Sequence, residues 1–276
     1  MKISQYLEKG SVRLGIVEKD YLQPIDFNGD MIDFIRKGNT IRDHGPAVHI
    51  SELEMAPAVS RPSKIIALGL NYTDHAREGK ADIPKVPLIF TKFQNSLLGS
   101  GGLITWKNSI TKKVDFEAEL AVIIGEKVYD CPEENALGAV FGFTCANDVS
   151  ARDLQFGDGQ WVRGKSLNTF CPLGPWIVTM DEIADPYALN IESRLNGQIM
   201  QKSNTGNLIF SVSYLVSFLS RHFTLFPGDI ILTGTPSGVG VFRDPPVYLK
   251  NGDEIVIAIE GIGELVNRCR VIPEQQ

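Results

Sequence analysis

The acidic residues Asp115, Glu117 and Glu119 alternate with nonpolar residues immediately before the apolar run 120–124. Alternate side chains of a β-strand share one face, so an extended segment would bring the three carboxylates together. Carboxylates that lie so near one another are stable only when they are solvated, protonated or bridged by a cation. An oxygen-only donor set favours a hard divalent ion, Mg²⁺ first, with Mn²⁺ or Ca²⁺ as alternatives. The same alternation is typical of the solvent-exposed face of an antiparallel sheet, so the pattern alone leaves both interpretations open.

A histidine and a glutamate, His75 and Glu78, lie three residues apart in the segment 69–80, which follows the apolar run 65–68. If the segment is helical, the two side chains can touch. The carboxylate would then fix the imidazole tautomer and raise its basicity, which would make His75 a general base. A surface helix whose histidine and glutamate both face solvent is the alternative.

Two further segments contain groups that could bind an anion. Lys165 follows a glycine and precedes an apolar, proline-containing segment. Such a lysine could hold a carboxylate or stabilise a developing enolate, although most lysines are solvated at the surface. The glycine-rich segment 232–240 exposes backbone N–H groups that could cradle an anion. It matches neither the Walker loop nor the GxGxxG pattern, and a plain turn accounts for it equally well.

Short strands must position these groups. The 276 residues include many turn-forming glycines and prolines, and apolar runs of strand length recur along the chain. A clean alternation at 189–197 predicts a half-exposed edge strand, and helices are predicted at 133–139 and 210–223. The fold class predicted is α+β and β-rich, with a β-roll or barrel. The other strands are expected at 65–68, 87–91, 120–124, 142–146, 176–179, 229–233 and 254–260.

The chain is predicted to contain two domains. Residues 1–60 read as a small N-terminal domain with a hairpin of strands 12–17 and 21–25. A short helix at 30–36, ending at Gly38-Asn39, completes it. The larger domain spans 63–276 and contains all the candidate site residues.

Composition excludes several classes of function. The net charge of −6 argues against nucleic acid or an anionic membrane as a partner. The four cysteines are too far apart for a zinc knuckle or a CxxC redox pair. The apolar stretch 208–219 is too short to cross a bilayer. No export signal is recognisable, so we expect a cytoplasmic protein with reduced thiols.

Five segments together resemble one family, the fumarylacetoacetate hydrolase superfamily, and in particular its short acylpyruvase and oxaloacetate-handling members. The resemblance extends from about residue 65 to residue 266. It implies a mixed β-roll or barrel of the family's C-terminal type with a small N-terminal α/β domain, assembled as a homodimer. The segments that carry it are Gly-Leu-Asn-Tyr-Thr-Asp-His (69–75), Asp-Phe-Glu-Ala-Glu-Leu-Ala (115–121), Ala-Asn-Asp-Val-Ser-Ala-Arg-Asp (146–153), Gly-Lys-Ser (164–166) and Thr-Gly-Thr-Pro-Ser-Gly-Val-Gly (233–240).

The resemblance also implies roles for individual residues. Asp115 falls outside the set of metal ligands, and a lid segment would carry the dyad that activates water. Mg²⁺ or Mn²⁺ is the implied cofactor. The implied ligands are Glu117, Glu119 and Asp148; the catalytic residues are His75, Glu78 and Lys165; and Arg152, Gln155 and Thr235 would hold the pyruvoyl end of a substrate.

The activity implied is hydrolysis of the C–C bond of acylpyruvate-like 2,4-dioxo acids, which yields pyruvate and a carboxylic acid. The metal and Lys165 would stabilise the enolate that forms as the bond breaks. The same electron sink would serve an oxaloacetate decarboxylase, an oxaloacetate keto–enol tautomerase, a dioxo sugar-acid hydrolase or a dienoate isomerase. A non-enzymatic binding protein is a further alternative, against which the intact set of acids, dyad and lysine argues. In each enzymatic case the partner is a small anionic 2-oxo acid.

Overall fold

The computed structural model describes residues 1–37, 41–42 and 44–274, and Gly38-Asn39, the predicted end of the first helix, lies outside them. The N-terminal segment forms β1 (Lys2–Glu8), β2 (Ser11–Glu18), β3 (Tyr21–Pro24) and α1 (Met31–Lys37), followed by β4 (Val48–His49) and β5 (Glu54–Met55). The predicted hairpin and helix are therefore present. Asp30 Oδ1 accepts hydrogen bonds from the N–H groups of Ile32 and Asp33, which stabilises the start of α1.

The largest sheet has 12 strands and joins the N-terminal segment to the rest of the chain. Its order is β4-β3-β2-β1-β14-β12-β11-β17-β6-β7, with β5 on β1 and β8 on β14. The predicted α+β, β-rich fold class is confirmed. Of the predicted roll or barrel, a closed barrel is not formed in the described residues, because β4 and β7 are the two unpaired ends of this sheet. The strands not yet bounded are β6 (Ile65–Gly69), β7 (Leu88–Lys92), β8 (Leu97–Leu98), β11 (Ala118–Ile124), β12 (Val140–Asn147), β14 (Cys171–Thr179) and β17 (Ile230–Leu232).

A second sheet of five strands has the order β16-β15-β18-β19-β9. The predicted edge strand is β15, which lies inside this sheet, so the edge assignment is wrong. Alternating polar and apolar residues indicate that one face of a strand is buried. Whether the strand lies at the edge of its sheet depends instead on backbone pairing with distant segments. The bounds are β9 (Leu103–Trp106), β15 (Asn190–Leu195), β16 (Gln198–Asn204), β18 (Glu254–Ile259) and β19 (Gly263–Val271).

Helices are few and mostly short. The predicted helix 210–223 is α5 (Val212–His222), which Ser211 caps by accepting a hydrogen bond from Tyr214 N. The segment 133–139 is helical as predicted but forms a 3-10 helix, η3 (Glu133–Ala139). No helix of the described ranges is long and apolar enough to span a membrane. The remaining elements are α2 (Thr73–Glu78), α3 (Arg152–Gly157), α4 (Val162–Lys165), β10 (Val114–Asp115), β13 (Ser150–Ala151), η1 (Ile50–Glu52), η2 (Gln94–Ser96), η4 (Met180–Glu182), η5 (Thr205–Asn207) and η6 (Gly240–Phe242).

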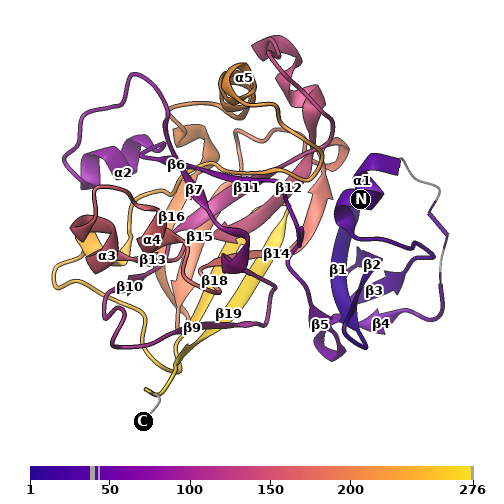
Figure 1. The fold of residues 1–276 in the computed structure, drawn as a ribbon, viewed down its shortest axis with the longest axis horizontal. Helices are drawn as coiled ribbons and strands as arrows, with labels where there is room; N and C mark the ends of the chain where they lie inside the picture. The colour runs from indigo at the N-terminus through magenta and orange to yellow at the C-terminus, as the bar shows by residue number, and fades with distance from the viewer. Residues whose placement is uncertain (38–40, 43, 275–276) are drawn as a thin grey trace.

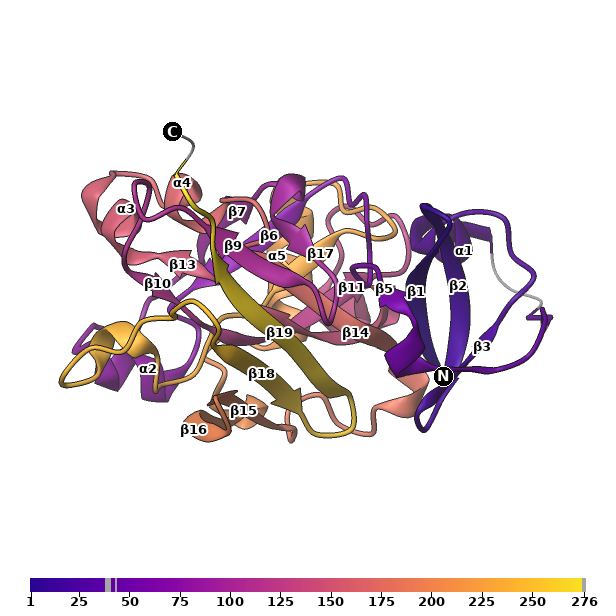
Figure 2. The same cartoon turned by 90° about the horizontal axis from the view of Figure 1, so that it is seen from below.

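Strand β11 explains why the centre of the sequence is so apolar. Every residue of this strand is buried, and its two faces enter different hydrophobic cores. Leu120, Val122 and Ile124 belong to the larger core, whereas Ala121 and Ile123 belong to the core shared with the N-terminal strands. Figures 1 and 2 place the indigo N-terminal strands at one end of the molecule and α2 and α3 at the other. The helices α2 and α3, which carry candidate site residues, therefore lie at the opposite end of the molecule from the N-terminal strands.

Candidate active site and metal centre

Three buried acids meet where β11 begins and β12 ends. Glu117, Glu119 and Asp148 each offer a carboxylate oxygen, and these atoms lie within 4.8 Å of one another. The register that pairs Ala118 with Asn147 brings the two strands' acids together. A hydrogen bond of 3.0 Å from Asp148 N to Glu117 O fixes the backbone at this junction.

Asp115 does not join this triad, so strand alternation alone predicted its position wrongly. Strand β10 ends at Asp115 and β11 begins at Ala118, so the strand is interrupted between Asp115 and Glu119, and Asp115 is not among the acids close enough to share a metal ion in the described chain. Asp115 instead accepts hydrogen bonds from Arg152 Nε at 2.8 Å and from Gly240 N at 2.8 Å. It is therefore a structural carboxylate that ties the glycine-rich loop to Arg152.

Three buried cations surround the triad. Lys165 Nζ lies 2.8 Å from Glu117 Oε2 and 2.6 Å from Asp148 Oδ2. Lys92 Nζ lies 2.5 Å from Asp148 Oδ1, and Arg152 Nη1 lies 2.6 Å from Glu117 Oε1. Each cation thus has a carboxylate partner, as burial of charge requires.

A glycine brings Lys165 to the site. A Cβ at Gly164 would lie 2.7 Å from Gln155 N and 2.9 Å from Ala151 O, so only glycine lets α4 pack this closely on α3. Lys165 is consequently held beside the triad rather than on the surface.

Charge and burial give the acids different protonation behaviour. Burial would raise the pKa of Glu117, but the charges of Lys165 and Arg152 outweigh burial and hold that pKa well below its usual range. Burial, followed by the charges of Asp148 and Glu117, raises the pKa of Glu119 well above its usual range. Burial would lower the pKa of Lys165, but Asp148 and Glu117 raise it, so the amine stays protonated.

The triad fits a divalent cation. Glu119 Oε2 accepts a hydrogen bond from Gly234 N at 2.8 Å, whereas Glu119 Oε1 is buried and has no hydrogen-bond partner in the part of the chain that the structure describes. A hard metal ion would satisfy this unpaired buried oxygen. It would also suit a donor set made only of oxygens, and it would compensate the cost of ionising the buried carboxylate of Glu119. The residues could therefore hold such an ion.

The predicted dyad is formed on α2. His75 Nδ1 lies 3.0 Å from Glu78 Oε2, and Glu78 Oε1 accepts a hydrogen bond from Gly238 N at 2.8 Å. The two side chains are only 13% and 19% exposed, so the solvent-facing alternative is excluded. Asp74 accepts hydrogen bonds from His75 N and from Ser203 Oγ, which anchors α2 to β16.

A cavity of about 310 Å³ joins the dyad to the triad. Its lining includes His75, Glu117 and Lys165 together with the predicted substrate-binding residues Arg152, Gln155 and Thr235. Arg152 Nη1 donates a hydrogen bond to Gln155 Oε1 at 2.9 Å, and Arg152 Nη2 is buried without a partner within the described ranges. Arg152 lines the cavity, and a guanidinium with an unpaired nitrogen is suited to binding a carboxylate. The structure thus brings every predicted site residue to one place.

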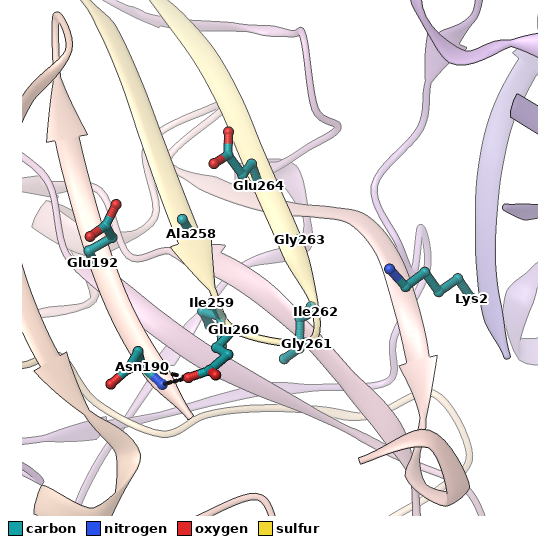
Figure 3. Close-up of a pocket in the computed structure, with 10 residues that line it drawn as sticks. All are labelled: Lys2, Asn190, Glu192, Ala258, Ile259, Glu260, Gly261, Ile262, Gly263 and Glu264. Atoms are coloured by element: carbon teal, nitrogen blue, oxygen red, sulfur yellow. Dashed lines mark hydrogen bonds between the residues drawn. The ribbon is translucent and has the colours of Figure 1, made fainter. Parts of the chain in front are cut away.

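Another cavity, at the β18–β19 hairpin, lacks these features (Figure 3). Glu260 accepts a hydrogen bond of 2.7 Å from Asn190, and Glu264 pairs with Arg194. The acids of this cavity are not among the residues close enough to share a metal ion in the described chain. The cavity beside the triad is therefore the candidate active site.

Two buried site residues escaped the sequence analysis. Lys92, on the edge strand β7, holds the Asp148 oxygen that does not bind Lys165. The sequence feature that could have indicated Lys92 is a lysine directly after an apolar strand segment. Gln201 accepts a hydrogen bond from Ala118 N and donates to Thr235 Oγ1, each at 2.8–2.9 Å. Nothing in the polar sequence of β16 marked Gln201 as a buried link between the triad strand and the glycine-rich loop.

Comparison with known proteins defines the class of this protein. Residues 64–270 match the family described as fumarylacetoacetate (FAA) hydrolase C-terminal. The chain therefore belongs to the fumarylacetoacetate hydrolase family, as the resemblance indicated, and it is an enzyme of that family. The match includes every candidate site residue.

Individual relatives have several activities. The chain is 43% identical over 263 residues to oxaloacetate tautomerase Fahd2a, mitochondrial, of Rattus norvegicus, covering 92% of this chain and 83% of that protein. A solved fumarylacetoacetate hydrolase from Exiguobacterium antarcticum is 36% identical with a TM-score of 0.89. A 2-hydroxyhepta-2,4-diene-1,7-dioate isomerase from Mycobacterium marinum is 33% identical with a TM-score of 0.83. Both alignments cover 99% of this chain and 100% of the solved chain.

Proposed function

We propose that this enzyme acts on small 2-oxo acids with a divalent metal, and that its best-supported reaction is keto–enol tautomerisation of oxaloacetate. The observation that carries the proposal is the buried triad beside Lys165 and Arg152, in a chain 43% identical to a protein named as an oxaloacetate tautomerase. Glu117, Glu119 and Asp148 would hold Mg²⁺ or Mn²⁺. Such an ion would act as a Lewis acid that favours the enolate form of a 2-oxo acid.

The cationic side chains would bind and orient the substrate. Arg152, through its unpaired Nη2, would hold the carboxylate next to the 2-oxo group, with Gln155 and Thr235 beside it. Lys165 is buried and protonated, so it would stabilise developing negative charge on the 2-oxo oxygen rather than act as a base. Because Lys165 is buried, this electrostatic contribution is larger than it would be in water.

His75 would move the proton. With Nδ1–H directed at Glu78, the lone pair of Nε2 is available to take a proton from C3 of the substrate. The electrons of the C–H bond form the C2–C3 double bond, and a proton delivered to the 2-oxo oxygen completes the enol. The reverse sequence restores the ketone, so one base and one anion-stabilising site suffice.

Hydrolysis of acylpyruvates is a second candidate, and the anchored dyad favours it. A histidine fixed by a carboxylate, as His75 is by Glu78, is an arrangement that activates water. Attack of that water on the distal carbonyl would break the C–C bond and leave the enolate of pyruvate, which protonation converts to pyruvate. The two reactions share the enolate and differ in whether water attacks.

The test is the ultraviolet absorbance of the enol of oxaloacetate. Purified protein with Mg²⁺ or Mn²⁺ should speed the approach to the keto–enol equilibrium, and a chelator should remove the effect. Acetylpyruvate under the same conditions reports hydrolysis through pyruvate formation. Catalysis that persists after the metal is removed would contradict the metal requirement, and inactivity toward both substrates would contradict the proposed function.

We also propose that the enzyme is a cytoplasmic homodimer. The Rattus norvegicus relative is named as a mitochondrial protein, so cell fractionation should decide the compartment. Sedimentation equilibrium of the purified chain should give twice the mass of 30.4 kDa.

A further inference from the structure

The cavity beside the triad has two chemically different halves. Its inner half contains the charged residues Glu117, Arg152 and Lys165. Its outer half is apolar and is built from segments far apart in the sequence. The outer residues are Leu70, Leu88, Phe90, Phe156, Trp161 and Phe242.

Phe90, on β7, forms the boundary between the two halves. Lys165 Nζ lies 5.2 Å from the centroid of the Phe90 ring, within the range of a cation–π contact. The Trp161 ring meets the same ring edge-on at a centroid distance of 5.4 Å. The polarity of the cavity therefore changes across a single side chain.

The backbone is adapted to the aromatic wall. A Cβ at Gly69, the last residue of β6, would lie 2.6 Å from Trp161 Cζ3 and 3.0 Å from Leu88 Cδ2. Only glycine at this position lets both side chains pack against the end of the strand. The apolar wall is thus held in place by the same strand that precedes the dyad helix.

Charge argues against an acidic group in the outer half. Of the residues that line the cavity, Arg152 and Lys165 are already ion-paired at its inner end, and His75 is bound to Glu78. Arg163, next to Trp161, is paired with Asp158. Among the described residues that line the cavity, a carboxylate placed beside the aromatic side chains would therefore meet no cation without a carboxylate partner.

An apolar group would instead be favoured there. Leu88, Phe156 and Phe242 are 48%, 61% and 46% exposed, so contact with an apolar group would remove their nonpolar surface from water. The cavity volume of about 310 Å³ is at least about twenty times the ~10–15 Å³ that a single water molecule requires, so the cavity has room for a substituent beyond the pyruvoyl group.

We propose that the outer half of the cavity is a subsite for an apolar substituent, so that among 2-oxo acids longer than oxaloacetate, whose tail reaches past Phe90, this enzyme prefers an alkyl or aryl tail over an acidic one. Acylpyruvates with extended alkyl or aryl acyl groups are the substrate class that combines such a tail with the required head. The inference rests on the proposed function only in that the 2-oxo acid head binds beside the triad. Burial of a methylene contributes ~0.8 kcal/mol, so each added methylene should tighten binding about fourfold until the wall is covered.

The test is calorimetric binding of unbranched 2-oxo acids to the Mg²⁺-loaded enzyme. Pyruvate, 2-oxobutanoate and 2-oxopentanoate should bind progressively more tightly, by about fourfold per methylene. 2-Oxoglutarate, which carries a carboxylate where 2-oxopentanoate carries a methyl group, should bind more weakly than 2-oxopentanoate. Equal affinities along the series, or tighter binding of 2-oxoglutarate, would overturn the inference.

Two variants and a control assign the effect to this wall. Trp161→Ala should remove most of the gain per methylene. Trp161 immediately precedes α4, which carries Lys165, so a second variant is placed on β7. Leu88→Arg should shift the relative affinity toward 2-oxoglutarate over 2-oxopentanoate by about threefold, because a partly exposed ion pair has an effect of that size. Phe223→Ala removes an aromatic side chain that is 43% exposed outside the cavity and should leave the series unchanged. Retention of the wild-type series in both wall variants would contradict the proposed subsite.

Binding separates this inference from the proposed function. Tightening along the series, with no catalysis of enol formation, would support the subsite and contradict only the reaction. Binding of pyruvate without further tightening would contradict only the subsite. Failure of all the acids to bind, pyruvate included, would contradict both.

Discussion

Replacement of Glu119 by glutamine should change how the stability of the metal-free protein depends on pH. Burial, with the charges of Asp148 and Glu117, raises the pKa of Glu119 above its ordinary value of 4.5. The folded protein therefore keeps a proton on Glu119 that the unfolded chain has already lost above about pH 4.5. In that range folding binds a proton, so the free energy of unfolding falls as pH rises. Glu119→Gln removes the titrating group but retains an oxygen that can accept the hydrogen bond from Gly234 N.

The size of the change in the free energy of unfolding follows from the titration of one proton on Glu119. A single group contributes a slope of at most ~1.4 kcal/mol per pH unit, hence at most about 4 kcal/mol between about pH 5 and about pH 8. Glu117 and Lys165 add no slope there, because the pKa of Glu117 lies below its usual range and that of Lys165 above its own. The difference between wild type and Glu119→Gln therefore isolates Glu119.

Urea unfolding of the chelated proteins at several pH values measures the difference. The wild type should lose stability relative to Glu119→Gln as pH rises, whereas Glu126→Gln, a change to an exposed acid, should follow the wild type. Metal binding to the wild type should also release about one proton, seen by calorimetry in buffers of different ionisation enthalpy. Parallel stability curves, with no proton released, would refute the protonated state of Glu119.

Further predictions concern the catalytic groups and their supports. His75→Ala should reduce acylpyruvate hydrolysis at least 10²-fold but spare part of any oxaloacetate decarboxylation, as measured by pyruvate formation; equal loss of both would contradict the assignment of His75 to water activation and proton transfer, because decarboxylation requires neither water attack nor removal of a C3 proton. Lys165→Ala should reduce both reactions by 10²-fold or more in the same assay, and near-normal rates would place Lys165 outside the chemistry. Gln201→Leu should lower the free energy of unfolding in urea by about 1–3 kcal/mol, because Ala118 N loses its acceptor; an unchanged value would show that another group replaces Gln201. Mg²⁺ at 100 times its Kd should stabilise the wild type by about 2.7 kcal/mol but not Glu119→Gln, and an equal rise in Tm for both would contradict the ligand assignment.

The local sequence pattern was sufficient to predict a helix or strand whose position depends on its own residues alone. The 3.6-residue spacing of Val212, Leu215 and Leu219 predicted α5, because a helix places these residues on one buried face. The apolar run 120–124 predicted a buried strand, and β11 is buried on both faces. The motifs around His75 and Asp148 predicted side chains that lie together in the candidate site, because the family resemblance supplied the relation between distant segments.

The remaining features depend on long-range pairing, which a single sequence does not encode locally. Asp115 was misplaced because the strand is interrupted at residues 116–117: Asp115 belongs to β10, which pairs with β13, and it binds the glycine-rich loop. β15 was taken for an edge because alternation cannot reveal that β16 covers its outer side. The apolar wall of the cavity joins Phe90 on β7 to Trp161 and Phe242, and no spacing along the chain connects those residues.

The central claim is that the buried triad and its neighbouring lysine promote enolisation of a 2-oxo acid with a divalent metal. Exchange of the C3 protons of oxaloacetate for deuterium, followed by nuclear magnetic resonance in D₂O, measures that step directly. The metal-loaded wild type should accelerate exchange above the rate without enzyme, and both the chelated wild type and metal-treated Glu119→Gln should fall to that background rate. Exchange catalysed equally well by the chelated protein or by Glu119→Gln would contradict the account.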